Sequence, residues 1–341
     1  MGSRLRGNDG FGVDTLTQKA SRAKLLLKAL LLLTVSGASH AASYPDKPIR
    51  FVVAFAAGGS IDLIARLFAQ KLTESIGQQV VVDNRPGAGG NLSAEITARS
   101  APDGYTLYIC APSLVVNAAL YAKIAYDPVR DFAPVTVLAS VQNALVAYPG
   151  FGAKSVKDLI ALAKSKPGQI NYASTGSGSS GHLVMEMFRS QAGIDITHVP
   201  YKTIGQTTAD LISGQVSLWF PTIPGALPHI KGGRMRALAV AGAKRSPALM
   251  DIPTVADAAA LPGFDAATWY AVLTPAGTAK AVVAKLNTEF LRALHAPDVQ
   301  ARLAAQGVES IGGTPEQAAA HIRNELPKWA KVVKAAGVRP D

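Results

Sequence analysis

The stretch INYASTGSGSSGHLVMEMF, residues 170–188, indicates how this chain folds, because a glycine-rich turn joins a strand-like run to a helix-like run. Gly176, Gly178 and Gly181 have the spacing G-x-G-x-x-G. Glycine lets the main chain approach a ligand closely, and the free N–H groups at a helix start attract negative charge. The turn therefore predicts an anion-binding site at the edge of a sheet.

Hydroxyl groups crowd this turn, and they decide which anion suits it. A dinucleotide needs bare backbone around its pyrophosphate, whereas hydroxyls suit the oxygens of a small carboxylate. We therefore expect carboxylate binding, with a serine-rich loop that only caps its own helix as the alternative. The side chains expected to contact the ligand are Ser174, Thr175, Ser177, Ser179 and Ser180.

A second stretch, FVVAFAAGGSIDLIARLF at residues 51–68, has the same order of strand, glycine turn and helix. Gly58 and Gly59 form the turn, and Ser60 is expected at the N-cap. Asp62 falls in the first helical turn, where a carboxylate suits the helix dipole. We expect these residues in the site, with a purely structural role for Asp62 as the alternative.

Two more segments fall at the ends of expected strands. NRPGAGGN, residues 84–91, is either a tight connection or a ligand-contacting loop beside the first turn. The run VPYKTIGQTTADLI places Tyr201 and Lys202 where α/β sheets display ligand groups. Lys202 either pairs with an anion or is simply solvated.

Short apolar strands alternate with amphipathic helices from residue 44 onward, which predicts α/β architecture with parallel sheets covered on both faces. After the first strand, Ile61, Ile64, Phe68 and Leu72 recur at helical spacing and predict one buried helix face. Residues 281–338 read as almost wholly helical, with apolar positions that fit a stripe laid on a sheet.

Two extended apolar segments, residues 135–150 and 264–277, are long enough to pass from one sheet to another. Their crossing would divide the chain into two lobes joined by a hinge of two strands. We expect residues 42–143 and 267–341 in the first lobe, and residues 144–266 in the second.

The N-terminus has the three parts of a secretory signal peptide. RAKLLLKALLLLTVSGASHA, residues 22–41, supplies positive charge, a short apolar run and a small-x-Ala exit. We expect residues 1–41 to be leader and signal peptide, with cleavage after Ala41 and a periplasmic product. An uncleaved N-terminal anchor is the alternative.

Charge and cysteine content narrow the function classes. Of 34 basic and 23 acidic residues, six and two lie in residues 1–41, which leaves the rest with a net charge of +7. Basic residues are scattered and do not interleave with aromatics, so nucleic acid is not an expected partner. The one cysteine, Cys110, lies in an apolar strand-like run and predicts a buried, inert thiol.

Enzyme signatures do not emerge from the sequence. It contains no G-x-S-x-G, H-E-x-x-H, C-x-x-C or G-x-x-x-x-G-K-[ST] motif, and its six histidines are dispersed. We therefore expect no catalytic residue, metal or cofactor. The enzyme alternative is a secreted serine hydrolase that pairs His182 with a serine of the 174–180 turn.

Many short segments, taken in order, resemble the Bug-type solute receptors of tripartite tricarboxylate transporters. The resemblance covers nearly all of the chain after residue 41, and the collinear set is specific even though no one segment is. The segments include YPDKPIRFVVAF, GGSIDLIAR, VVDNRPGAGGN, PDGYTL, YDPVRDFAPV, KPGQINYAS, HVPY, LPHIKGGRMRALAV, KRSPALMDIPTVADA, TPAGT and KWAKVVKAAG.

The resemblance implies a monomeric, two-lobed receptor of the Venus-flytrap kind with type II topology, which closes on a small organic carboxylate and docks on a membrane permease. It implies that the first turn holds one carboxylate partly through water and that the serine-rich turn grips another. The first-turn residues implied are Phe55, Gly58, Gly59, Ser60 and Asp62. A sensory or scavenging protein without a permease is a further alternative.

This chain departs from the family pattern at three positions near these turns. Ala54 replaces a common proline, Thr203 a common glycine, and Pro221 a common acidic residue. Loss of that carboxylate removes a partner for a ligand ammonium. We therefore expect a simple organic acid rather than an amino acid.

Overall fold

The computed structural model describes Gly2 and residues 44–336 of the 341-residue chain. Gly2 and residues 44–46 belong to a separate N-terminal unit, Met1–Asp46, so the account below concerns the unit Lys47–Asp341. The expected leader, signal peptide and cleavage site lie outside the described residues. Across the described part of the chain, no helix combines the length and apolar character needed to cross a membrane.

The first of two mixed sheets has six strands in the order β11-β4-β10-β3-β1-β2. β1 is parallel to β2 and β3, whereas β10 is antiparallel to β3 and β4, and β11 is antiparallel to β4. The strands are β1 (Ile49–Val53), β2 (Val80–Asn84), β3 (Thr106–Cys110), β4 (Phe132–Val141), β10 (Thr268–Pro275) and β11 (Val308–Ser310).

Helices of the first lobe come from both ends of the chain. They are α2 (Ser60–Ile76), the short η1 (Ala88–Gly90), α3 (Asn91–Ala98), α4 (Ser113–Leu120), α10 (Lys280–Leu294), α11 (Pro297–Ala305) and α12 (Pro315–Ala336). α12 contacts β4 and α4 in this lobe and α6 in the other, so it bridges the two.

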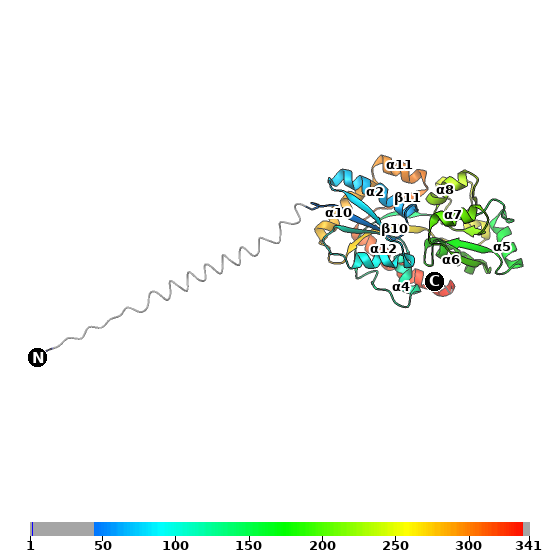
Figure 1. The fold of residues 1–341 in the computed structure, drawn as a ribbon, viewed down its shortest axis with the longest axis horizontal. Coiled ribbons are helices and arrows are strands. Elements are labelled where there is room, and N and C mark those ends of the chain that lie inside the picture. The colour runs from blue at the N-terminus through cyan, green and yellow to red at the C-terminus, as the bar shows by residue number, and fades with distance from the viewer. Residues whose placement is uncertain (1, 3–43, 337–341) are drawn as a thin grey trace. The chain divides into compact units, whose positions relative to one another are not determined.

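The second sheet has five strands in the order β7-β6-β8-β5-β9. Its strands are β5 (Ala144–Ala147), β6 (Asn171–Ser174), β7 (Thr197–Pro200), β8 (Leu218–Trp219) and β9 (Arg236–Val240). Its helices are α5 (Val156–Ser165), α6 (Ser180–Ala192), α7 (Ile204–Ile212), α8 (Ile223–Lys231), η2 (Pro247–Leu249) and α9 (Val255–Ala259). Figure 1 shows this lobe, in green, beside the first lobe that carries α2 and α10.

The expectation of parallel sheets is wrong for the strands that follow a crossing. β4 ends at Val141 and β5 begins at Ala144, so the chain passes directly from one sheet into the other. It enters the second sheet at the end that faces the first sheet. β5 is therefore antiparallel to β8. For the same reason β10, which returns from the second sheet to the first, is antiparallel to β3. β1, β2 and β3, and likewise β6, β7 and β8, are parallel as expected.

A hydrogen bond ties the two crossings together. Asn143 lies in the first crossing, and its Oδ1 accepts a bond of 3.0 Å from Thr268 Oγ1 at the start of β10. Asn143 Nδ2 also donates to the carbonyl of Phe220 at 2.7 Å. The crossings are therefore held in register by one buried amide side chain.

The helical periods correctly predicted the faces that pack. In α2, Ile61, Ile64, Phe68 and Leu72 are all buried. α10 lays its apolar stripe against β4 and α2. The C-terminal region is less uniform than expected, because Val308–Ser310 forms the edge strand β11, a segment too short and polar to reveal its pairing.

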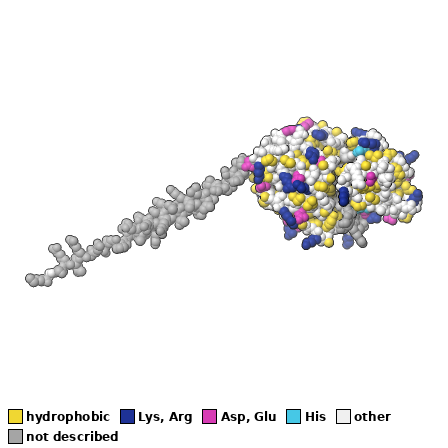
Figure 2. Space-filling model, in the orientation of Figure 1, with side chains coloured by type: hydrophobic (Ala, Val, Ile, Leu, Met, Phe, Trp, Pro, Cys, Tyr) yellow, Lys and Arg dark blue, Asp and Glu magenta, His cyan; other side chains and the backbone are white. Residues whose placement is uncertain are grey.

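Charged side chains are scattered over the visible surface. Figure 2 shows Lys and Arg in small, separate groups among hydrophobic and uncharged side chains, some of them beside Asp or Glu. Most ion pairs are local, such as those between Arg66 and Asp62 and between Arg189 and Glu186. The positive excess therefore does not form a single basic patch on the face shown.

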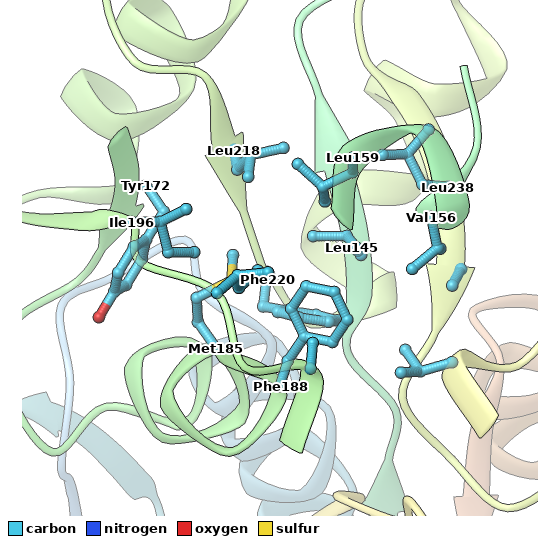
Figure 3. Packing of buried hydrophobic residues seen from close by; sticks show 14 of the residues in the cluster. Leu145, Val156, Leu159, Tyr172, Met185, Phe188, Ile196, Leu218, Phe220 and Leu238 are labelled. Atoms are coloured by element: carbon cyan, nitrogen blue, oxygen red, sulfur yellow. The ribbon is translucent and has the colours of Figure 1, made fainter. Parts of the chain in front are cut away.

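The second lobe has a large hydrophobic core beneath α6. Phe188 and Phe220 meet edge to face with ring centres 6.2 Å apart, and Figure 3 shows them with Met185 between the helix and the sheet. This core fixes α6 against the sheet, and hence the turn at its start. In the first lobe Cys110 is fully buried, and burial raises the pKa of its thiol to about 12, in agreement with the predicted inert thiol.

Candidate functional site

Two neighbouring cavities lie between the lobes, at the carboxyl ends of the parallel strands. The inner chamber encloses about 80 Å³ and is lined by residues that follow β1, β3, β6 and β8. The outer chamber encloses about 670 Å³. Phe55, Thr175 and Ile204 line both cavities and so form the boundary between them. Open α/β sheets bind ligands at this edge.

The first turn is shaped by a buried carboxylate. Asp62 Oδ2 accepts bonds from the Gly58 amide at 2.9 Å and from Arg66 Nε at 3.0 Å. Its Oδ1 accepts a bond from Asn84 Nδ2 at 3.0 Å. Burial by itself raises the pKa of Asp62, but the bonds from Arg66, Gly58 and Asn84 outweigh it, so the pKa lies below its ordinary value.

The serine-rich turn is shaped by a histidine in the same relative position. The Gly178 amide donates to His182 Nδ1 at 3.1 Å. The ring of His182 stacks on His198 at 4.1 Å, and His198 stacks on Tyr172 at 5.0 Å. The turn is thus supported by a column of rings that extends into the second lobe.

Four helices begin at the inner chamber without a side-chain cap. They are α2, α4, α6 and α8, and residues at the start of each line the cavity. Elsewhere in the second lobe, Ser155 and Thr254 cap α5 and α9 through their side chains. The start of a helix carries about half a positive charge. At α4 the Leu114 and Val115 amides already donate to backbone carbonyls, and at α8 the Ile223 amide donates to the Gln142 carbonyl, so these two helices contribute mainly through their dipoles. The inner chamber therefore attracts an anion.

The inner chamber attracts anions although no charged side chain lines it. Among its lining residues none is Lys, Arg, His, Asp or Glu. Ser60 Oγ lies 2.8 Å from Thr222 Oγ1 and 2.6 Å from the hydroxyl of Tyr270. Burial raises the pKa of Tyr270 to about 12, against the opposing effect of its bond with Ser60, so this hydroxyl stays neutral.

Two serine hydroxyls in the chamber have no hydrogen-bond partner among the residues that the structure describes. Ser113 Oγ comes from the start of α4 in the first lobe, and Ser179 Oγ from the start of α6 in the second. Both side chains are almost fully buried, at 3% and 2% exposed. Buried hydroxyls are normally bonded, so an unbonded pair that lines one cavity from two sides is available to donate to an acceptor bound there.

The outer chamber is different in chemistry. The third turn, with Pro86 and Gly90, forms its wall in the first lobe, and Tyr201 and Lys202 form its wall in the second. Lys202 is the one Lys, Arg, His, Asp or Glu among the residues that line either cavity. Of the two readings of the third turn, the structure places it against the cavity.

Most of the predicted site residues line one of the cavities. Phe55, Gly58, Gly59, Ser60, Thr175, Ser179 and Ser180 line the inner chamber. Phe55, Thr175, Ser177, Tyr201 and Lys202 line the outer chamber. Asp62 and Ser174 line neither: Asp62 anchors the first turn from behind, and Ser174 lies beneath the second.

Several lining residues were missed by the sequence analysis. Among them are Ser113, Ile204, Trp219, Thr222, Thr268 and Tyr270. Ser113 and Thr222 follow the strand-like runs TLYIC and VSLWF and precede helices, so the rule that found the glycine turns also applies to them. Their turns contain few glycines, which is why they were passed over. Tyr270 lies in the second crossing segment, which was expected only to connect the two sheets. As the antiparallel strand β10 this segment pairs within the first sheet and brings Tyr270 to the cavity.

The hydrolase alternative can be compared with the hydroxyl that the structure pairs with a histidine. Ser174 Oγ lies 2.6 Å from Nε2 of His198, not of His182. Ser174 is fully buried and also accepts a bond from the Gly176 amide at 3.1 Å. Its hydroxyl is therefore directed into its own turn, away from a carbonyl bound in the cavity. In the described chain, no group of three or more acidic, histidine or cysteine side chains could hold a metal.

Comparison with known proteins assigns the family. The sequence profile described as "Tripartite tricarboxylate transporter family receptor" matches residues 64–338. Protein BugT of Bordetella pertussis is 38% identical over 299 residues, which cover 87% of this chain and 91% of BugT.

Two solved structures have the same two-lobed fold. R. palustris Rpa4515 with adipate has a TM-score of 0.84 and 38% identity, and periplasmic binding protein BugD has a TM-score of 0.83 and 32% identity. Each match covers 87% of this chain and the whole of the other chain. The expected fold class is confirmed, and this chain belongs to the receptors of the tripartite tricarboxylate transporter family, whose members are solute-binding proteins of the periplasm.

Proposed function

We propose that this protein captures a small organic carboxylate between its lobes and delivers it to the membrane subunits of a tripartite tricarboxylate transporter. One observation carries the proposal: unpaired, buried hydroxyls of Ser113 and Ser179 line one cavity from opposite lobes. A carboxylate oxygen can accept bonds from both at once. No covalent step is involved.

The physical chemistry of the chamber favours a carboxylate over a cation or a neutral ligand. Four helix starts without a side-chain cap supply positive potential, while the lining supplies hydroxyl donors and no charged side chain. Hydrogen bonds to a charged group each contribute on the order of 1.5–3 kcal/mol. The adipate bound to Rpa4515 is a ligand of the same chemical class.

Closure of the lobes around the ligand is the second part of the proposal. Residues 42–143 and 267–341 form one lobe and residues 144–266 the other, with the two crossings as hinge. Ser60 bonds Thr222 across the cleft at 2.8 Å, and a Cβ on Gly89 would lie 2.7 Å from the Ser177 carbonyl. The lobes therefore touch closely. A ligand that satisfies both serines favours this closed form, since it binds the open form less well.

The route to the periplasm and the partner complete the proposal. Residues 1–41 act as leader and signal peptide, the exported chain is a monomer, and its closed form docks on the permease. N-terminal sequencing of protein recovered from the periplasm checks the cleavage after Ala41. Deletion of the permease genes should abolish growth on the ligand as carbon source, and continued growth would leave a receptor with a sensory or scavenging role.

Ligand binding can be tested directly. Thermal unfolding is followed with adipate, succinate, citrate, benzoate and glutamate, since a ligand of the folded form raises the melting temperature. We expect a simple organic acid to stabilise the protein and titration calorimetry to give 1:1 binding. Ser113→Ala should weaken that binding roughly tenfold or more through the loss of one charged hydrogen bond. A protein that no acid stabilises would contradict the proposal.

A further inference from the structure

The two chambers differ in how they can neutralise an anion. The inner chamber relies on helix starts and hydroxyls, with no charged side chain in its lining. The outer chamber is the more spacious of the two, and Lys202 is its one charged lining residue. Because Phe55, Thr175 and Ile204 line both chambers, an elongated acid can extend from the inner chamber past these side chains into the outer one.

The helix beside Lys202 has its first turn occupied. Thr203 caps α7 by accepting a bond from the Gln206 amide at 3.3 Å, and Thr207 Oγ1 donates back to the Thr203 carbonyl at 2.8 Å. Because this cap already occupies an N–H group of the first turn, fewer free N–H groups remain at the start of α7 to bind an anion. In the second lobe, positive charge at the outer chamber therefore comes from the ammonium group of Lys202.

Lys202 is placed to meet a ligand rather than another part of the protein. Its side chain is exposed, and no ion pair joins it to an acidic side chain among the described residues. Across the chamber, the wall in the first lobe ends at Gly90, the N-cap of α3, which carries no side-chain cap. The far end of a bound ligand thus faces a cation on one side and a helix start on the other.

We propose, on the basis of the proposed carboxylate function, that Lys202 is a specificity-determining residue that selects elongated ligands with a second anionic group. The first carboxylate occupies the inner chamber beside Ser113 and Ser179. An apolar spacer passes between Phe55 and Ile204, and the second carboxylate lies in the outer chamber beside Lys202. A compact polyacid leaves Lys202 without its partner, and a monocarboxylate of equal length forgoes one ion pair.

The test uses matched acids and the protein expressed from its full-length sequence. Calorimetry at fixed ionic strength compares adipate with hexanoate, and suberate with octanoate. We expect the wild type to prefer each dicarboxylate by roughly tenfold, the scale of one partly exposed ion pair with a hydrogen bond. Lys202→Met should remove this preference while leaving hexanoate binding within about twofold, and Lys202→Arg should keep it.

Matched variants separate this inference from the proposed function. Lys231→Met, an exposed lysine at the end of α8 outside both linings, should bind all four acids as the wild type does. Ser113→Ala should weaken hexanoate and adipate equally. If Lys202→Met keeps the wild-type preference, or the wild type shows none, the role of Lys202 is refuted and carboxylate binding stands. If none of the acids binds the wild type, both proposals fall. Circular dichroism confirms that each variant is folded.

Discussion

The first turn and the serine-rich turn share one geometry but differ in what they leave unpaired. In each, a glycine amide donates to the side chain four residues later: Gly58 to Asp62 and Gly178 to His182. In the first turn the acceptor is an anion, and Ser60 Oγ is already bonded. In the second the acceptor is a ring nitrogen, and Ser179 Oγ has no partner.

This difference indicates that the two turns have different roles. A carboxylate at the start of α2 already offsets part of the positive potential there, whereas α6 has no acidic residue in its first turn. The second turn should therefore contribute more to the affinity for an anion, and the first more to the stability and shape of the cleft. Each prediction below tests one side of this contrast.

The largest expected effect is on stability, from Asp62→Ala. The change leaves the Gly58 amide and Asn84 without their acceptor and removes a nearly fully buried charge paired with Arg66. We expect the free energy of unfolding to fall by about 2–3 kcal/mol, measured by urea denaturation. Asp257→Ala, at an exposed position in the first turn of α9, is the control and should cost under about 0.5 kcal/mol. Equal losses in the two variants would contradict a special role for Asp62.

Replacement of the equivalent glycines should separate the turns by affinity. Gly178 has φ +79°, and a Cβ there would lie 2.8 Å from Asn117 Oδ1 in the opposite lobe. Asn117 cannot yield easily, because it is buried and donates to the Gly89 carbonyl and to Asn91. Gly178→Ala should thus hinder closure by about 1–3 kcal/mol, which corresponds to an affinity for adipate that is about 5- to 150-fold weaker in calorimetry.

Gly58→Ala is the matched control for that experiment. Gly58 has a similar φ of +88°, but a Cβ there would meet nothing within 4 Å. The variant should lose about 1–2 kcal/mol of unfolding free energy from backbone strain, with affinity reduced by less than about threefold. Stronger loss of affinity in Gly58→Ala than in Gly178→Ala would reverse the proposed contrast.

Local patterns predicted the turns well, because each signal lies within one segment. The glycines at 58, 59, 176 and 178 and the apolar period of α2 need only neighbouring residues, and each appears at the expected end of a strand. What the sequence could not give is which groups satisfy one another across long separations. Tyr270 bonds Ser60 from 210 residues away, and no local pattern announces such a pair.

Because the sequence does not show which groups bond to one another in the folded chain, it also does not separate structural side chains from those that line the cavity. Ser174 and Asp62 have the residue types of ligand contacts, yet both bond to the backbone of their own turns. Ser113 has an unremarkable context in the sequence, but its hydroxyl lacks a partner once the lobes are assembled. The three-dimensional pairing of donors and acceptors therefore decides between a structural role and a ligand contact.

Replacing each of two N-cap serines in the second lobe by alanine tests whether the pairing of its hydroxyl decides the role of a serine. Ser155 accepts a bond from the Asp158 amide in a capping box on α5, whereas Ser179 begins α6 without capping it. Ser155→Ala should lower the free energy of unfolding by about 1 kcal/mol and leave adipate affinity unchanged. Ser179→Ala should weaken adipate binding roughly tenfold with no loss of stability, because its hydroxyl has no bond to lose. The reverse result would mean that Ser179 caps its helix in solution.

The smallest effect concerns acid. Because its hydrogen bonds to Arg66, Gly58 and Asn84 outweigh desolvation, the pKa of Asp62 lies below the ordinary 3.8. The unfolded chain then binds the proton first, so the stabilisation from Asp62 is present above pH 3.8 and is lost as pH falls through the lower, folded pKa.

The decrease in unfolding free energy between pH 5 and pH 3 should therefore be smaller in Asp62→Asn than in the wild type, because the other carboxylates are the same in both proteins. Equal acid sensitivity in Asp62→Asn and wild type would mean that the first turn is not anchored by charge, and the contrast between the two turns would reduce to their serines.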